Sequence, residues 1–332
     1  MNEIKQDVLL GQDKQDWIAG ANSPIQRKIL MESGNWRSVS IPNEIQFINY
    51  GKANAYESMM CVAFNEGTDA IEYIMMQMLR LNLIPAKHTS WLTENKYFKD
   101  GVLNFNERYT AIKGETTNQG AYQYKVANGM KNWGLVPQDS MPFADNFEDN
   151  INPKFISPEL EELGLAFKKR FYINYEWVNI EDTKEFLKYS PLSCVGQYAD
   201  GEGILKPPTN NGHCMLQVDE TDEYREIDDS YWRQFKKYNK NSLQSFMAFY
   251  ITPIIFNIMF DTTKFLSDNN NKIVRNTNTG AYGVIYNKTP LHITAERAGL
   301  FMLDRDARKL IGKSDKVEIT DSDWNLLGWK NF

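Results

Sequence analysis

The sequence predicts an α+β fold in which helices come first and β-strands follow. The strongest helical periodicity begins directly after Cys61, further helical patterns continue to about residue 190, and strand-like runs dominate between residues 193 and 251. Helices followed by strands are typical of α+β domains, and two facing halves are one common arrangement of them. We expect a cleft between the halves, which would bring Cys61 close to His213.

Three helices are expected in the first part of this region. The first follows Cys61, and its apolar residues recur at three- and four-residue steps until Asn82 and Pro85 close it. The second starts near Gly120 and stops at Gly134. The third runs from near Ile180 to just before Pro191. The apolar residues of the first helix are Ala63, Ala70, Ile71, Ile74, Met75, Met78 and Leu79; those of the second are Tyr122, Val126, Met130 and Trp133.

Strands are expected at residues 193–197, 214–218 and 246–251, where short apolar runs alternate with turn signals. The composition divides the chain into three zones. Residues 1–50 form an N-terminal arm with few periodic signals, residues 51–252 form the main domain, and residues 253–332 form a small, β-rich C-terminal appendage with clusters of turn-forming asparagines.

The composition excludes several classes of protein. The net charge of −6 disfavours a nucleic-acid partner held by bulk electrostatics, and the three cysteines among 332 residues do not make a disulfide framework. The sequence shows no signal peptide and no apolar run long enough to cross a membrane. It therefore predicts a protein of the cytoplasm or of a virion, with no membrane partner.

Cysteine, histidine and acid occur in an order that suits nucleophilic catalysis. Cys61 starts a helix, where unpaired amides and the helix dipole favour a thiolate. His213 begins an apolar strand and could act as the base, and Asp228 or Asp229 could orient the histidine. Each residue also has a plainer interpretation. Cys61 and His213 could be ordinary core residues, and the acidic stretch from residue 219 to 229 could be a solvated loop.

Taken together, these segments resemble the papain-like cysteine peptidases, in a divergent phage- or bacterial-type form. The resemblance covers about residues 45–252. Its motifs are Cys61-Val62-Ala63-Phe64 at the nucleophile, Asn118-Gln119-Gly120, Gly134-Leu135-Val136 and Met141-Pro142-Phe143 in the middle stretch, Ser190 to Val195 before the histidine, Gly212 to Val218 around it, and Ile227 to Trp232 around the orienting residue.

The resemblance implies a two-lobed fold, with a helical lobe followed by an antiparallel β lobe, and a triad of Cys61, His213 and Asp229. Asp229 takes the position where the family usually has asparagine, directly before Ser230 and an aromatic residue. A second departure is Ala55, which stands where the family places an oxyanion-binding glutamine. Asn54, Asn49 or Ser58 could replace that glutamine if the loop carries an insertion. An ionised Glu57 could not, because it would repel the developing charge.

Other kinds of site have weaker support. His213 and Cys214 are adjacent on a strand and point to opposite faces, so they cannot both bind one zinc ion. The Gly201-Glu202-Gly203 sequence lacks the lysine and helix of a phosphate-binding loop. We therefore expect no cofactor and no metal.

The sequence leads to two functional hypotheses. The first is a cysteine peptidase that cleaves a peptide or isopeptide bond in a protein substrate. The second is a catalytically degenerate papain-like fold that serves as a structural or interaction protein, such as a component of a phage particle. The C-terminal appendage would then contact another protein or a second copy of the chain, because its end, residues 324–332, is too aromatic for a free tail.

Overall fold

A computed structural model describes most of the main domain and short segments elsewhere. Two compact units, Met1–Pro253 and Ile254–Phe332, are described separately. The described residues are 8–9, 27–196, 211–231, 234–254, 266–268, 273–276, 282–286, 289–293, 317–319 and 330–331.

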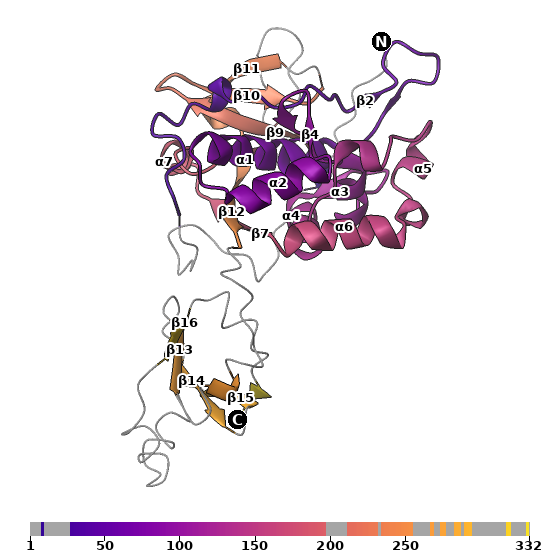
Figure 1. Cartoon of the computed structure of the whole chain (residues 1–332). Coiled ribbons are helices and arrows are strands. Elements are labelled where there is room, and N and C mark those ends of the chain that lie inside the picture. The colour runs from indigo at the N-terminus through magenta and orange to yellow at the C-terminus, as the bar shows by residue number, and fades with distance from the viewer. Residues whose placement is uncertain are drawn as a thin grey trace. The chain divides into compact units, whose positions relative to one another are not determined.

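Helices make up much of the first half of unit 1, and Figure 1 shows α3, α4, α5 and α6 gathered on one side of it. The helix after Cys61 begins as a π-helix and continues as α1. Asn106 caps α3 and Ser157 caps α6, each by accepting a hydrogen bond from a first-turn amide. The helices are the π-helix Val62–Asp69, α1 Ala70–Arg80, α2 Ala86–Glu94, α3 Glu107–Lys113, α4 Gln123–Trp133, α5 Phe147–Asn150, α6 Pro158–Lys168 and α7 Thr183–Phe186.

An antiparallel sheet forms the other part of unit 1, in the order β11-β10-β9-β8-β12-β7. The long pairing of β12 with β7 joins the last strand to the segment that follows the helices. Together the helices and the sheet confirm the α+β class. The strands are β7 Phe171–Val178, β8 Leu192–Gly196, β9 Asn211–Glu220, β10 Tyr224–Asp229, β11 Gln234–Asn239 and β12 Gln244–Pro253.

A short N-terminal strand, β1 (Val8–Leu9), connects the sheet to the helical part. It pairs in parallel with β6 (Ala121–Tyr122), directly before α4, and antiparallel with the start of β9. In register, Val8 lies opposite both Ala121 and Gly212. The backbone of β1 therefore occupies the position between the two edges.

The helix predicted after Cys61 is present, but its first eight residues are a π-helix that the apolar spacing did not predict. The second predicted helix corresponds to α4, and Gly134 ends it with a φ of 70°. A side chain there would also collide with the Gly164 carbonyl. The third is shorter than expected, because α7 covers only Thr183–Phe186.

The main core lies between α1 and the sheet. Fully buried side chains of α1, such as Ile71 and Met75, belong to the same cluster as Phe249 and Met247 of β12. Trp36 also joins this cluster and donates its indole N–H to the Leu187 carbonyl at 2.7 Å. A smaller cluster surrounds the thiol and contains Cys61, Val62, Ala121, Val126, Val195 and Cys214.

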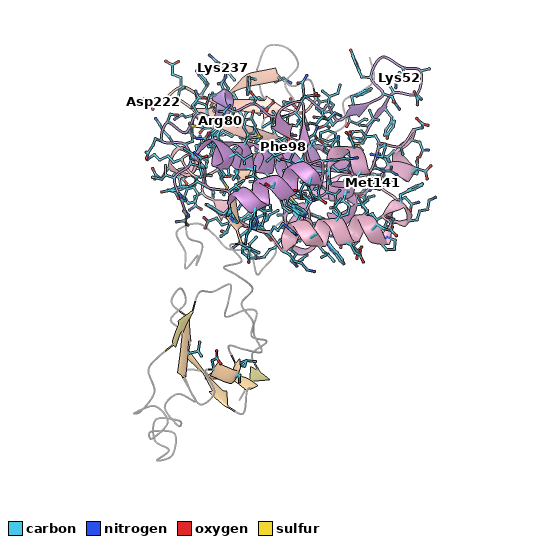
Figure 2. All side chains as sticks on the ribbon, in the orientation of Figure 1. Lys52, Arg80, Phe98, Met141, Asp222 and Lys237 are labelled. Carbon is cyan, nitrogen blue, oxygen red and sulfur yellow. The ribbon has the colours of Figure 1, made fainter. Side chains whose placement is uncertain are left out.

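Many charged side chains lie on the outside of unit 1, among them Lys52, Arg80, Asp222 and Lys237 (Figure 2). Other charged groups are buried, and one of them, Glu176, pairs with a partly exposed arginine. Arg27 contacts Glu176 of β7 through two hydrogen bonds of 2.7 and 3.0 Å, and the Tyr250 hydroxyl donates to the same carboxylate at 2.5 Å. This contact anchors the chain to the sheet at residue 27.

In the described part of the chain, no helix has the length and apolar character needed to span a bilayer.

The described strands of unit 2 form one sheet in the order β16-β13-β14-β15-β17. The central strands are antiparallel hairpin partners, and the two outer strands pair in parallel with their neighbours. Most of the aromatic end at residues 324–332 lies outside the described residues. The strands are β13 Ile273–Asn276, β14 Tyr282–Tyr286, β15 Thr289–Ile293, β16 Val317–Ile319 and β17 Lys330–Asn331.

A buried carboxyl on α1 makes the stability of unit 1 sensitive to pH. Glu72 is 1% exposed, and one of its oxygens accepts the Phe105 N–H at 2.8 Å. Burial raises the pKa of Glu72 well above its usual value, and the charges of Asp69 and Glu107 raise it further. The folded protein therefore keeps a proton that the unfolded chain releases, so stability is full at low pH and falls as pH rises towards the raised pKa.

We expect Glu72→Gln to increase the free energy of unfolding at pH 7 by about 1 kcal/mol or more, because the amide keeps the acceptor and does not have to bind a proton on folding. Below pH ~4 the two proteins should be equally stable, because the carboxyl is protonated in both states. Urea unfolding across this pH range measures the difference. Exposed Glu162→Gln is the control and should change little at any pH. A destabilised Glu72→Gln at pH 7 would contradict the expectation.

Candidate active site

Cys61 lies at the start of the π-helix and is completely buried. Its Sγ accepts a hydrogen bond of 3.3 Å from the backbone N–H of Cys214, the residue directly after His213. The thiol from the helix and the strand that carries the histidine therefore meet, although they are far apart in the sequence. The helix dipole and the Cys214 N–H both favour negative charge on the sulfur.

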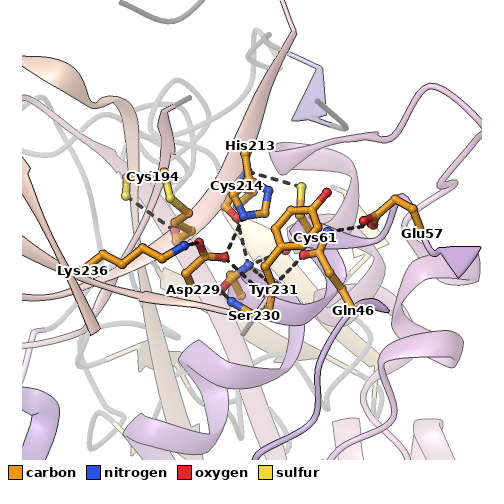
Figure 3. A network of polar contacts seen from close by, with 12 residues as sticks. Gln46, Glu57, Cys61, Cys194, His213, Cys214, Asp229, Ser230, Tyr231 and Lys236 are labelled. Carbon is orange, nitrogen blue, oxygen red and sulfur yellow. Dashed lines mark hydrogen bonds and ion pairs between the residues drawn. The ribbon is translucent and has the colours of Figure 1, made fainter. Parts of the chain in front are cut away.

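His213 is held by a carboxylate on the neighbouring strand. Its Nε2 lies 2.9 Å from Oδ1 of Asp229, and both residues are fully buried. Figure 3 shows Asp229 between His213 and Lys236. Since Nε2 is engaged by Asp229, Nδ1 is the ring nitrogen that can serve the thiol. A proton on Nε2 leaves the lone pair on Nδ1, which is the tautomer that a base requires.

Asp229 has donors for both of its oxygens. Oδ1 also accepts the Tyr231 N–H at 3.0 Å, and Oδ2 accepts Nζ of Lys236 from β11 at 2.7 Å. Burial by itself raises the pKa of Asp229. The charge and hydrogen bond of His213, followed by those of Lys236, outweigh burial and hold the pKa well below its usual value. The carboxylate therefore stays ionised at neutral pH.

The neighbouring acid, Asp228, has a different environment. Its Oδ2 accepts a hydrogen bond of 2.8 Å from the hydroxyl of Tyr73 on α1. Alternation along β10 explains the difference, because successive side chains point to opposite faces of a sheet. The solvated loop that was considered for residues 219–229 is not what the structure shows. Residues 224–229 form a strand in which Ile227, Asp228 and Asp229 are buried.

An aromatic ring covers the imidazole. The centroids of His213 and Tyr231 are 4.7 Å apart, and the ring planes are tilted by 54°. Tyr231 is 1% exposed. The ring excludes water from one side of the His213–Asp229 contact and strengthens the electrostatic interaction within it.

The other two thiols have different surroundings. Burial raises the pKa of Cys194 to about 12, which keeps it a neutral thiol, and its Sγ faces the Met215 carbonyl at 3.6 Å. The Sγ of Cys214 lies 3.4 Å from the Ser193 hydroxyl, on the opposite side of β9 from His213.

The three side chains that were considered as replacements for the oxyanion glutamine have different environments. Asn54 is exposed and donates to Asp145 at 3.2 Å, so its amide is not directed at the thiol. Asn49 sits in a turn with a φ of 56°. Ser58 is buried three residues before Cys61, and its hydroxyl has no hydrogen-bond partner among the described residues. Ser58 therefore remains the candidate side chain nearest to Cys61 in sequence.

Three residues at the site were not predicted from the sequence: Asn65, Gln46 and Lys236. Asn65 interrupts the apolar pattern four residues after Cys61, and a polar residue on a buried helix face is a signal that could have identified it. Gln46 lies in a loop segment with no periodicity. Lys236 comes from β11, and only the hairpin register, in which Asp229 is opposite Gln234, places it near the carboxylate.

The chemistry that these contacts support is proton transfer and nucleophilic attack by sulfur. The arrangement provides a thiol at a helix start, an imidazole with one nitrogen held by an ionised carboxylate, and an aromatic cover. Within the described ranges, no group of three or more histidine, cysteine, aspartate or glutamate side chains is arranged to hold a metal ion.

Comparison with known proteins finds no matching family model and no matching curated protein. Among solved structures, a match is found with the cysteine protease CMS1MS2 of Carica candamarcensis, solved in complex with E-64. The identity is 13%, the TM-score is 0.38, and the match covers 66% of this chain and 96% of that one. At this level the likeness carries no inference about activity.

We expect Lys236→Met to raise the pKa of Asp229, because it removes one of the charges that lower it. A carboxylate with a lowered pKa stabilises the fold above its unfolded pKa, and that contribution is lost as pH falls through the folded pKa. A smaller lowering should therefore move the acid-unfolding midpoint to higher pH. Circular dichroism during acid titration measures the midpoint.

The matched control is Lys237→Met, on the same strand. Lys237 lies at the surface (Figure 2) and stacks over Tyr224 at 4.2 Å. The Lys237→Met variant should have an acid-unfolding midpoint close to that of the parent protein. An equal shift in both variants would mean that overall charge, and not the contact with Asp229, determines the midpoint.

Proposed function

We propose that the chain is a papain-like cysteine peptidase, in which Cys61 is the nucleophile, His213 the general base and acid, and Asp229 the orienting residue. One observation carries the proposal. The N–H that follows His213 contacts the Cys61 sulfur at 3.3 Å, while Nε2 of the same histidine contacts Asp229 at 2.9 Å. A nucleophile, its base and an orienting carboxylate are the groups that a thiol hydrolase requires, which supports the proposal.

The proposed reaction has two halves. His213 Nδ1 takes the proton from Cys61, and the thiolate forms a bond to the carbonyl carbon while the π electrons move onto the oxygen. The backbone N–H of Cys61 donates to that oxygen. The oxyanion then collapses, the C–N bond breaks, and the nitrogen leaves as an amine with the proton from His213. Water, deprotonated by His213, attacks the thioester; the C–S bond breaks and the sulfur regains its proton.

The pairing of β1 supports the proposed substrate class. Its backbone pairs with Ala121 on one side and with Gly212 on the other, directly before His213. Ala121 also belongs to the cluster that contains Cys61 and Cys214. The two edges beside the thiol are thus suited to an extended polypeptide backbone. This supports a peptide or isopeptide bond in a protein as the substrate.

The first test compares the reactivities of the three thiols. We expect iodoacetamide to alkylate Cys61 of the folded protein faster than Cys194 or Cys214, because only Cys61 has a helix start and a histidine-bearing strand beside it. His213→Ala should slow the reaction about tenfold or more. Peptide mapping by mass spectrometry gives the rate for each cysteine. Equal rates at all three, or none at Cys61 without unfolding, would contradict the proposal.

The same preparation tests hydrolysis. A library of peptides and isopeptide-linked substrates should yield new amines, and Cys61→Ser should lose that activity. Cys194→Ser is the matched control, because Cys194 is equally buried and its pKa is raised to about 12. The control should hydrolyse at the parent rate.

A specific observation favours the second candidate function, a papain-like fold used as a structural or interaction protein. Cys61 and His213 are both 0% exposed, and Asn54 is turned away towards Asp145. A site that substrate cannot reach performs no hydrolysis. In this version, partners or a second copy of the chain would bind through residues 253–332, and the relevant aromatic residues lie mostly outside the described ranges.

A proline in β1 separates these two functions. Leu9→Pro removes a backbone donor from a strand that is paired on both sides, so it should free the position beside the thiol. For a peptidase, we expect alkylation of Cys61 to become several-fold faster. Lys99→Pro, in the short strand β4 (Phe98–Lys99), is the control and should leave the rate unchanged. No acceleration in Leu9→Pro would favour the structural function.

A further inference from the structure

We propose that Asn65 is a positioning residue of the site, which sets the distance between the thiol and the histidine. The proposal rests on the proposed function, because it assigns Asn65 a role in the same reaction. The side chain is completely buried and makes four hydrogen bonds to three separate segments of the chain.

Each of these segments carries one member of the proposed triad. The Asn65 Nδ2 lies 3.0 Å from the carbonyl oxygen of Cys61 and 2.9 Å from that of Cys214, the neighbour of His213. It also lies 2.7 Å from the hydroxyl of Ser230, the neighbour of Asp229. One rigid amide thus connects the helix, β9 and the end of β10 at the residues where the triad is built.

The orientation of this amide is fixed by its partners. The two carbonyl oxygens can only accept hydrogen bonds, so they require the NH₂ group. On the other side, the backbone N–H of Ser230 can only donate, and it lies 3.3 Å from Oδ1 of Asn65. A flipped amide would place its oxygen against the Cys61 and Cys214 carbonyl oxygens, and its NH₂ group against the Ser230 N–H. The arrangement therefore has a single orientation.

The network continues to the segment that leads into Cys61. Ser230 donates its hydroxyl hydrogen to Oε1 of Gln46 at 2.6 Å, and Gln46 donates from Nε2 to Glu57 at 2.9 Å. The same Glu57 oxygen accepts the N–H of Met59 at 3.2 Å. Met59 has a φ of 54°, a backbone conformation that residues other than glycine rarely adopt. The chain is thus held on both sides of Cys61.

The π-helix explains why Asn65 can reach all three segments. In a π-helix the backbone bonds run from residue i+5 to residue i, and the Ala70 N–H does bond to the Asn65 carbonyl. The wider turn changes the direction of the side chains relative to an α-helix. Asn65 donates back to Cys61 one turn earlier and still faces β9 and Ser230.

A small displacement here affects the reaction more than the fold. Catalytic groups misplaced by about 1 Å can lose about 100-fold in rate. Without the Asn65 amide, the Cys61 and Cys214 carbonyl oxygens lose a donor that also contacts the Ser230 hydroxyl. The effect should therefore appear in the thiolate fraction and the nucleophilicity of Cys61.

The experiment is the pH profile of Cys61 alkylation in Asn65→Ala, in the full chain. We expect the rate to fall about tenfold and the midpoint of the profile to move to higher pH, because the thiol loses its alignment with the histidine and the Cys214 N–H. The melting temperature is measured on the same samples.

Asn106→Ala is the matched control. Asn106 is also buried, donates from Nδ2 to the Gln138 carbonyl and side-chain oxygens and to the Met141 carbonyl, and accepts the Tyr109 N–H. It therefore loses the same number of hydrogen bonds, but from segments that carry no triad residue. Both variants should melt at lower temperature, and only Asn65→Ala should change the alkylation profile.

The outcomes distinguish the two proposals. Parent protein whose Cys61 reacts no faster than Cys194 overturns the proposed function itself. A reactive parent, with an unchanged profile in folded Asn65→Ala, overturns the role of Asn65 alone. If Asn65→Ala does not fold, Ser230→Ala removes the hydroxyl link of the same network and must slow alkylation at least about threefold. A parent-like rate in that variant overturns the positioning role as well.

Discussion

The buried charge of Asp229 is the constraint on which the site depends. A carboxylate without solvent is stable only when charges and donors surround it, and Asp229 receives them from two neighbouring strands and its own turn. The order of β9, β10 and β11 in the sheet is thus also an electrostatic requirement. Only a central β10 places His213 on one side of the carboxylate and Lys236 on the other.

The same sheet order connects charge to packing. β10 continues into the turn that contains Ser230 and Tyr231, so the backbone that ends the strand supplies both a donor to Asp229 and a ring against His213. Ser230 lies between Asp229 and Tyr231 in the sequence, and its hydroxyl contacts Asn65 and Gln46. Three consecutive residues therefore serve three different neighbours. This explains why their environments are so different despite their proximity in sequence.

The sequence could predict what depends on local pattern. The helix after Cys61, the strand around His213 and the α+β class follow from periodicity. Strand alternation places Asp228 and Asp229 on opposite faces, and the choice of Asp229 comes from the resemblance, which puts the orienting residue directly before Ser230. The π-helix could not be predicted, because its apolar spacing resembles that of an α-helix. Lys236 could not be found either, since its place depends on hairpin register. Asn54 reflects a third limit: the loop before Cys61 turns its amide towards Asp145.

The N-terminal segment is attached at two places, and this affects how easily another peptide could displace β1 from its position between β6 and β9. β1 pairs with β9 directly before His213, and Arg27 forms a bidentate ion pair with Glu176 on a different strand of the sheet. A strand that belongs to the same chain cannot diffuse away after it is released. Its effective concentration is of the kind that short tethers produce, on the order of millimolar. A free peptide of equal intrinsic affinity would have to exceed that concentration to take its place.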